Sequence, residues 1–193
     1  SLGTGATFQS ASLDLANAVT RVRFADGTTA KVFVHATEPF GMIRFTGAAP
    51  EKVTLLPPPF SGEITEEAGA NKISAGDLAT LRYPAPQVHE GDHWTGYTQR
   101  GWEGYTQRGW EGFHFAVVLR WQQTDEGWVA VWSVAASNET SDPLQQARRI
   151  CDDAIKAGFA PTLATHAAWW KDYWDGASVS LPNLILERQW YLE

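Results

Sequence analysis

The sequence predicts a mainly β protein, an antiparallel β-sandwich followed by α-helical linker elements. Short runs rich in β-branched and aromatic residues recur over the first two-thirds of the chain and are separated by turn residues. After about residue 140 the apolar residues recur instead at helical spacing. We therefore expect a β-sandwich domain over residues 1–138 and helical elements over residues 139–193.

The first strands are predicted on either side of a tight turn. Residues 13–24 (LDLANAVTRVRF) form one β-rich run and residues 29–37 (TAKVFVHAT) form the next. Asp26-Gly27 lies between them, and an Asp-Gly pair at this place is typical of a β-hairpin because glycine accepts a positive φ. Residues 41–47 (GMIRFTG) are predicted as a third, short strand.

The strongest strands are predicted over residues 113–121 and 128–136, joined by the turn-like Thr124–Gly127. Side chains alternate between the two faces of a strand, so each face of the first can be read separately. One face carries Phe113, Phe115, Val117, Leu119 and Trp121, and the other carries His114, Ala116, Val118 and Arg120. Both faces are largely apolar, which predicts a central strand that is covered on both sides.

Three helices are predicted in the last third of the chain. Residues 141–143 (SDP) are a helix start, because Asp142 or Ser141 can cap free N–H groups and Pro143 suits the first turn, and Gly158 is the predicted end. A second helix is expected over residues 161–174, broken by Gly176. A third begins near Leu184 and lacks a terminating residue, so we expect it to be the first helix of a further domain, with the chain a truncated one.

Composition excludes several classes of partner. The net charge is −7 and the isoelectric point about 5.2, so no basic field attracts a nucleic acid or an anionic membrane. No run of about 18 apolar residues predicts a membrane span. The single cysteine, Cys151, cannot form an internal disulfide and lies on the apolar stripe of a predicted helix, so we expect it to be a packing residue.

Tryptophan is the unusual component, with 10 residues in a chain of 193. Its flat apolar face and single N–H donor suit the C–H faces and hydroxyl edges of sugars, but the same rings also pack β-sandwich cores. Composition therefore leaves two alternatives for each ring, core packing and carbohydrate contact, and no cofactor is predicted.

The candidate binding residues lie in an aromatic stretch over residues 94–113. Rings that stack on a sugar, with Arg and Glu to bond its hydroxyls, are one interpretation of this stretch. Docking against another domain and simple turn structure are the alternatives. The candidate carbohydrate-binding residues are Trp94, Tyr97, Arg100, Trp102, Glu103, Tyr105, Arg108, Trp110 and Glu111.

The same stretch contains a tandem repeat, because residues 96–103 and residues 104–111 both read GYTQRGWE. Two copies are too few and too short for a solenoid. An insertion of eight residues, an even number, keeps every side chain on its face of a strand. We therefore hypothesise that the two copies compete for one place in the sheet.

The histidines and carboxylates of the chain yield no predicted catalytic or metal site. Glu90, Asp92, Glu103 and Glu111 are expected to be solvated loop residues, although glycoside hydrolysis needs such a carboxyl pair. Residues 89–93 (HEGDH) carry metal-ligand chemistry but no specific spacing, so a polar loop is expected. His35 and His114 are expected to be hydrogen-bonded strand residues, and His166 is expected to pack or cap against a further domain.

Residues 166–193 (HAAWWKDYWDGASVSLPNLILERQWYLE) resemble the junction between the N-terminal sandwich and the catalytic toroid of six-hairpin glycoside hydrolases, most of all the family 95, α-L-fucosidase type. The matching features are His166 with Trp169 and Trp170, then residues 178–182 (SVSLP), then a helix from Leu184. Residues 22–47 and 109–121 resemble the sandwich of the same group, although the doubled GYTQRGWE departs from the single copy expected there.

The resemblance implies a supersandwich-like N-terminal domain, with residues 139–193 as linker and start of a truncated α/α toroid. It also implies a parent that hydrolyses glycosidic bonds with inversion and is secreted or periplasmic. Its catalytic acid and base would lie in the toroid, so no residue of this chain is predicted to be catalytic. A free-standing carbohydrate-binding β-sandwich module is the alternative.

Overall fold

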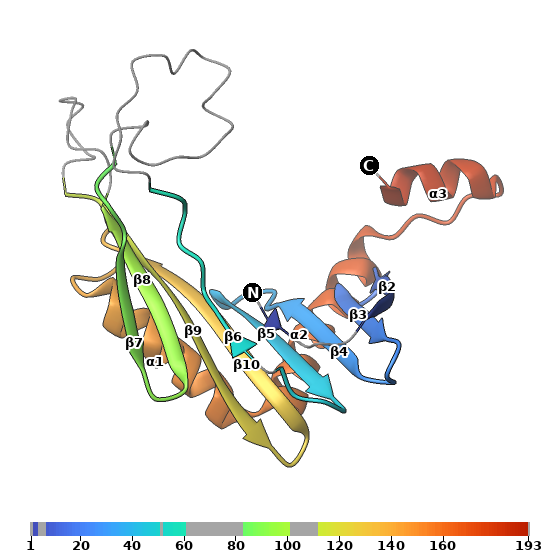
Figure 1. Cartoon of the computed structure of the whole chain (residues 1–193). Coiled ribbons are helices and arrows are strands. Elements are labelled where there is room, and N and C mark those ends of the chain that lie inside the picture. Colours follow the sequence, from blue (N-terminus) through green and yellow to red (C-terminus); the bar gives the residue numbers. More distant parts are fainter. Residues whose placement is uncertain (1, 4–6, 51, 61–82, 101–111, 193) are drawn as a thin grey trace, which may run out of the picture.

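The computed structural model describes residues 2–3, 7–50, 52–60, 83–100 and 112–192. Its main element is an eight-stranded antiparallel sheet with the strand order β2-β3-β4-β5-β10-β9-β8-β7. The strands of this sheet are β2 (Phe8–Asp14), β3 (Val19–Phe24), β4 (Thr29–Val34), β5 (Phe40–Thr46), β7 (Gln87–Gly91), β8 (Trp94–Arg100), β9 (His114–Thr124) and β10 (Gly127–Ala136). Figure 1 shows the sheet as one curved layer.

Two helices cover one face of this sheet, α1 (Pro143–Ala157) and α2 (Phe159–Ala177) (Figure 1). Helix α1 packs on β9 and β10. The main core lies between the sheet and the helices, where Met42, Val118 and Cys151 are completely buried. A third helix, α3 (Leu184–Leu192), projects beyond the sheet after an extended linker. Strands and α1 thus share one core, and the predicted boundary at residue 138 remains a prediction.

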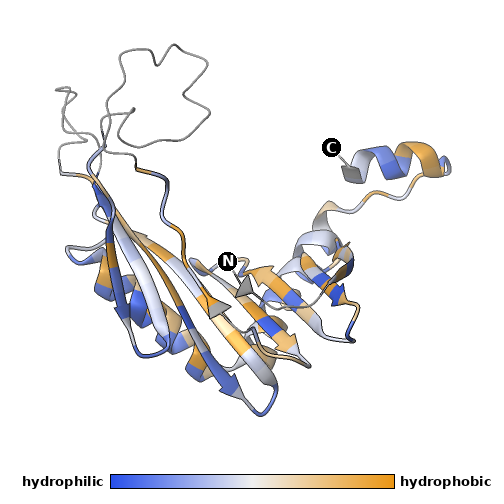
Figure 2. Ribbon diagram, in the orientation of Figure 1, coloured by the Kyte–Doolittle hydropathy of each residue, from blue (hydrophilic) through white to orange (hydrophobic). Residues whose placement is uncertain are grey.

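The opposite face of the sheet, here called the open face, carries a second apolar cluster. Phe45, Leu119 and Trp128 are buried there, and Val53 and Leu55 from the following chain pack on them. A two-stranded sheet of β1 (Leu2–Gly3) and β6 (Lys52–Val53) lies on this side. Figure 2 shows the alternation of apolar and polar residues along the strands. The mainly β, antiparallel class is confirmed, whereas the described residues show only this short second sheet where a full sandwich layer was predicted.

The predicted run 13–24 is not one strand. It contains the end of β2, a turn at residues 15–18, and β3, and β2 pairs with β3 as a hairpin. Asp14 holds the turn, because its Oδ1 accepts the Ala16 N–H at 3.2 Å, and Ala18 takes a positive φ of 47°. The β-rich composition hid this turn, which lacks the glycine that usually marks a positive φ.

The remaining predictions of the β region agree with the structure. Gly27 has a φ of 86° in the β3–β4 hairpin, and the third predicted strand is β5. Strand β9 lies between β8 and β10, as expected for a central strand.

The predicted bounds of the first helix agree with the structure, whereas α2 begins two residues before the predicted start at residue 161 and ends after the predicted end. The Asp142 Oδ1 accepts the Gln145 N–H at 3.0 Å, and Gly158, with a φ of 89°, ends α1. Helix α2 is longer than predicted and runs through Gly176. A glycine in a helix costs about 1 kcal/mol relative to alanine, too little to end α2 by itself. Among the described residues no helix is long and apolar enough to cross a membrane.

Candidate functional site

Three of the candidate carbohydrate-binding residues lie on the described strand β8, namely Trp94, Tyr97 and Arg100. The other six lie outside the described residues: Trp102, Glu103, Tyr105, Arg108, Trp110 and Glu111. The first GYTQRGWE copy therefore supplies residues 96–100 of β8, and the second copy, residues 104–111, lies outside the described residues. The carbohydrate-binding role of all nine residues remains a prediction.

Trp94 is half-buried on the face of the sheet that α1 covers. The Arg148 guanidinium carbon lies 4.2 Å from the centre of its ring, which is a cation–π contact. On the neighbouring strand, a side chain at Gly91 would collide with the indole. The ring is thus held between Gly91 and Arg148, and packing accounts for its position.

Tyr97 lies on the open face, opposite to Trp94. Its ring meets Phe115 edge-to-face with 6.2 Å between ring centres. Partial burial raises the pKa of the Tyr97 phenol, so it stays a neutral donor and acceptor. Arg100, at the end of β8, shares the face of Trp94 and is exposed. Trp94 and Tyr97 therefore cannot form one flat platform for a sugar.

The HEGDH stretch forms the hairpin between β7 and β8. His89 Nε2 lies 3.1 Å from Thr98 Oγ1, and His93 Nδ1 lies 2.7 Å from Asp92 Oδ1. Within the part of the chain that the structure describes, no group of three metal-ligating side chains comes together. Residues 89–91 belong to β7 and only Asp92 and His93 form the turn, so the predicted polar loop is largely the end of a strand.

A cleft of about 590 Å³ opens between α1, α2 and the loop that joins β4 to β5. Its lining includes His35, Glu38, Phe40, Arg149, Asp153 and Thr165. Two of these form an ion pair, with 3.7 Å between Arg149 Nη1 and Asp153 Oδ2. No pattern in the sequence indicates the cleft, because its walls come from segments more than 100 residues apart.

His35 closes one end of this cleft in a defined protonation state. Its Nδ1 accepts the backbone N–H of Glu38 at 3.2 Å, so the proton lies on Nε2, which donates to Thr165 Oγ1 at 3.1 Å. Burial lowers the pKa of His35, the nearby His166 lowers it further, and Glu38 opposes both. A neutral His35 thus joins α2 to the end of β4.

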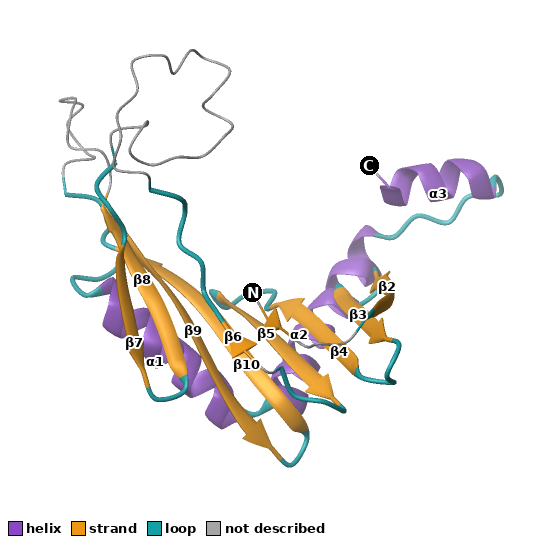
Figure 3. Cartoon of the chain, in the orientation of Figure 1, coloured by secondary structure: helices purple, strands orange, loops and turns teal. Residues whose placement is uncertain are grey.

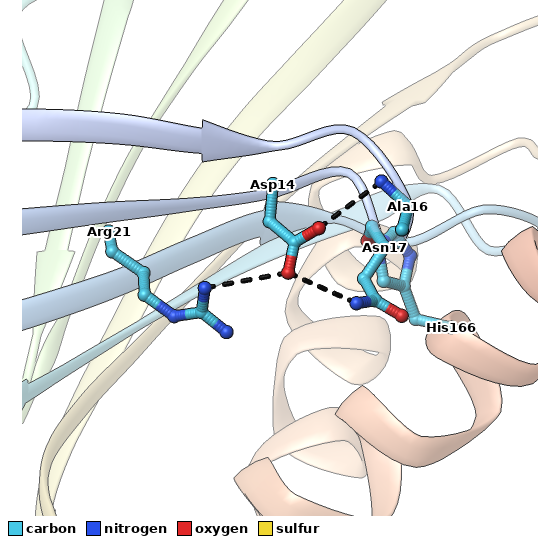
Figure 4. A network of polar contacts seen from close by, with 5 residues as sticks. All are labelled: Asp14, Ala16, Asn17, Arg21 and His166. Atoms are coloured by element: carbon cyan, nitrogen blue, oxygen red, sulfur yellow. Dashed lines mark hydrogen bonds and ion pairs between the residues drawn. The ribbon is translucent and has the colours of Figure 1, made fainter.

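His166 is completely buried under α2, and this corrects the expectation that it packs against a further domain. Its Nε2 donates to the Asn17 carbonyl oxygen at 2.7 Å, and its ring centre lies 4.8 Å from that of Phe33. Figure 4 shows how Asp14 supports this contact by binding Ala16, Asn17 and Arg21. The first half of α2 lies on the sheet, so the partner of His166 is the β2–β3 turn.

The second half of α2 carries a continuous set of ring contacts that we call the aromatic row. Trp169 stacks on Tyr173 with 5.6 Å between ring centres, and Trp174 meets Tyr191 of α3 at 5.5 Å. The Trp174 Nε1–H also donates to the Leu15 carbonyl oxygen at 3.0 Å. The members of the row are Trp169, Trp170, Tyr173, Trp174, Trp190 and Tyr191.

This row passes from buried to exposed along α2. Trp170 is half-buried beside His166, whereas Trp169 is 40% exposed and Tyr173 45% exposed. On α3, Leu184, Ile185 and Leu186 are exposed as well. We call these exposed apolar side chains of α2 and α3, two helices that meet at Trp174 and Tyr191, the α2–α3 surface.

The last two predicted residues, Cys151 and His114, have structural roles. Cys151 is completely buried, and burial raises the pKa of its thiol to about 12, so it is no nucleophile. His114 Nδ1 donates to the Gly112 carbonyl oxygen at 2.9 Å, as expected for a hydrogen-bonded strand residue.

Comparison with known proteins leaves the family open. No family model matches the chain, and no curated protein matches it. Among solved structures, a chain from human microbiome that is named as a kojibiose phosphorylase superposes with a TM-score of 0.47 and 11% sequence identity. The match covers 84% of this chain and 22% of that one. The resemblance to glycoside hydrolases, and to family 95 in particular, therefore remains a prediction from the sequence.

Proposed function

We propose that this chain is an N-terminal, non-catalytic domain of a glycoside hydrolase acting on glycans, and that it supports a helical catalytic toroid. The α2–α3 surface is the observation that carries this proposal. Trp169 and Tyr173 are exposed on α2, Leu184, Ile185 and Leu186 are exposed on α3, and the two helices meet where Trp174 contacts Tyr191. Large exposed apolar surfaces mark interaction sites in soluble proteins.

The place of this surface in the sequence favours a helical domain as its partner. Residues 166–193 carry the resemblance to the sandwich–toroid junction, and they form the outer half of α2, the linker and α3. In the linker, the Leu181 N–H donates to Glu187 Oε2 at 2.7 Å, and the Val179 N–H donates to the Tyr191 hydroxyl at 3.1 Å. These bonds hold α3 at one angle to the linker, ready to contact a toroid beside it.

The proposal assigns catalysis to the toroid. Hydrolysis of a glycosidic bond needs one protonated and one ionised carboxyl group on opposite sides of that bond. In the cleft beside α1, Asp153 is paired with Arg149, and Glu38 lies in the turn that His35 holds. These carboxylates serve structure, so we expect the chain alone to be inactive on sugars.

A free-standing carbohydrate-binding module is the second candidate, and one observation favours it. The open face carries the partly exposed rings of Tyr97, Phe115, Trp121 and Trp132. Aromatic side chains on a sheet face can stack on sugar rings. This candidate would make the open face, rather than the α2–α3 surface, the functional one.

The parent protein tests the first candidate. In the full-length parent that this proposal implies, we expect Trp169→Ala with Tyr173→Ala to lower glycosidase activity and thermal stability. Val34→Ala is the matched control, because Val34 is 64% exposed on the open face. Glycosidase activity in the purified 193-residue chain, or equal effects of both changes, would contradict the proposal.

A further inference from the structure

Three basic residues lie directly opposite one another on three adjacent strands of the sheet. Arg21 of β3 pairs in register with Lys31 of β4, and Lys31 pairs in register with Arg44 of β5. We call these three residues the basic row. Like charges at directly opposite positions of a sheet repel one another and destabilise it. The stability of the sheet therefore gives no reason for this arrangement.

The side chains of the basic row belong to the face of the sheet that α1 and α2 cover. Each member lies two positions along its strand from a residue of the main core, and alternation along a strand puts both on the same face. The Arg44 guanidinium carbon lies 4.6 Å from the centre of the Phe159 ring at the start of α2. The core residues concerned are Val19, Phe33 and Met42.

Two carboxylates hold the ends of the basic row and leave its centre free. Arg21 Nη1 lies 3.4 Å from Asp14 Oδ2, a contact that Figure 4 shows, and Arg44 Nη1 lies 2.9 Å from Glu126 Oε2. Lys31 has no acidic partner among the residues that the structure describes. Within the same residues, the Arg44 Nε–H is buried and has no hydrogen-bond acceptor.

We propose that the basic row binds a small molecule with a doubly charged oxyanion, a phosphate or sulfate group, held over Lys31 between the two guanidinium groups. Neighbouring strands lie about 4.8 Å apart, so three long side chains from adjacent strands can reach one group of this size. Each arginine keeps further N–H donors after it has paired with its carboxylate. Guanidinium groups suit such a ligand because their planar fork binds oxyanions with two parallel hydrogen bonds.

The local charge fits a dianion. Arg23 lies two positions after Arg21 on the same face and is exposed, so four cations stand against the two carboxylates, a local excess of two positive charges. The chain as a whole carries a net charge of −7, which repels a long polyanion, so the ligand is a small molecule. The site is separate from the α2–α3 surface and does not rest on the proposed function.

NMR titration of the 15N-labelled chain tests the site. The probes are sodium phosphate, sodium sulfate and phenyl phosphate, each at a constant ionic strength set with sodium chloride. We expect saturable shifts of the backbone amide signals of the basic row. Tighter binding of phenyl phosphate than of inorganic phosphate would assign the group to an ester, and equal or weaker binding would assign it to the free oxyanion.

Lys31→Met is the decisive change, because it removes the central charge and keeps the aliphatic stem. We expect it to weaken binding at least about fivefold, since a charge-assisted contact is lost, whereas Lys31→Arg should retain binding. Lys171→Met is the matched control. It removes the same charge from α2, where Lys171 pairs with Asp175, and should leave the affinity unchanged.

The stability of the unliganded chain gives a second measurement. Loss of the central charge relieves the repulsion in the row, so Lys31→Met should not lower the Tm. A lower Tm would show that Lys31 serves the fold and would overturn the proposal. It would also be overturned by the absence of saturable shifts with all three probes, or by equal weakening of binding in the Lys31→Met and Lys171→Met variants.

Discussion

The Nε2 atom of His166 lies 2.7 Å from the carbonyl oxygen of Asn17, a residue 149 positions earlier in the sequence. This bond joins the middle of α2 to the β2–β3 turn, and the Trp174–Leu15 bond repeats the connection about two helical turns later. Helix α2 is thereby fixed to the edge of the sheet. The orientation of the α2–α3 surface depends on this attachment.

Replacement of His166 by phenylalanine tests the attachment. The variant keeps a ring beside Phe33 but leaves the Asn17 carbonyl oxygen buried without a donor. We expect the free energy of unfolding to fall by about 2 kcal/mol in urea titrations. His89→Phe is the control, since His89 lies on the edge strand β7 and bonds Thr98 of β8. This change should lower the free energy of unfolding by less than about 1 kcal/mol. Equal losses in the two variants would contradict the special role of His166.

Acidification should weaken the fold through His35. Its pKa in the folded chain lies below the ordinary value of 6.5, so between these two values the unfolded chain binds more protons. The stabilisation is complete above pH 6.5 and is lost as the pH falls toward the folded pKa. We expect the free energy of unfolding to decline over this range.

The His35→Asn variant isolates this contribution, because an amide oxygen can still accept the Glu38 N–H. We expect the wild-type curve of stability against pH to be steeper than that of the variant just below pH 6.5. Asp14 acts in a separate range. The Asn17 hydrogen bond lowers its pKa from 3.8, so its contribution is lost only at more acidic pH. Parallel curves near pH 6 would contradict the assignment to His35.

Gly41 should resist substitution because the Trp132 indole lies across it on the open face. A Cβ atom at residue 41 would collide with that ring. We expect Gly41→Ala to lower the free energy of unfolding by about 1–3 kcal/mol through overpacking. Adding Trp132→Val should remove most of this cost, which a double-mutant cycle measures.

Gly176→Ala is the matched control for Gly41→Ala, and we expect it to have the opposite effect on the free energy of unfolding. A Cβ atom at residue 176 would meet nothing within 4 Å, and the residue is helical. Alanine should therefore stabilise the chain by up to about 1 kcal/mol. A destabilising Gly176→Ala or a neutral Gly41→Ala would show that the packing around these two residues is described wrongly.

Local features of the fold could be predicted from the sequence, but the elements that cover each face of the sheet could not. The Asp26-Gly27 hairpin, the Asp142 cap and the Gly158 stop depend on residues a few positions apart, and all three are found. Strand β9 is central, as expected, but Phe115 and Trp121 on its open face are partly exposed. Its apolar pattern cannot tell whether helices or a second sheet provide the cover, so the complete sandwich stays a prediction.

The candidate site also has some features that the sequence could predict and others that it could not. Trp94 and Tyr97 are an odd number of positions apart, so alternation along a strand already places them on opposite faces, and the sequence could have revealed this. The partner of His166 could not be predicted, because Asn17 becomes its neighbour only when α2 lies along the edge of the sheet. The cleft beside His35 was hidden for the same reason.

Titration of the purified chain with mono- and oligosaccharides, followed by tryptophan fluorescence, tests the central claim most directly. Trp121 and Trp132 on the open face and Trp169 on the α2–α3 surface are partly exposed and would report a bound sugar. If the chain supports a catalytic toroid and does not itself hold sugars, the emission spectrum will not change with sugar concentration. A saturable change would contradict this account and favour the carbohydrate-binding module.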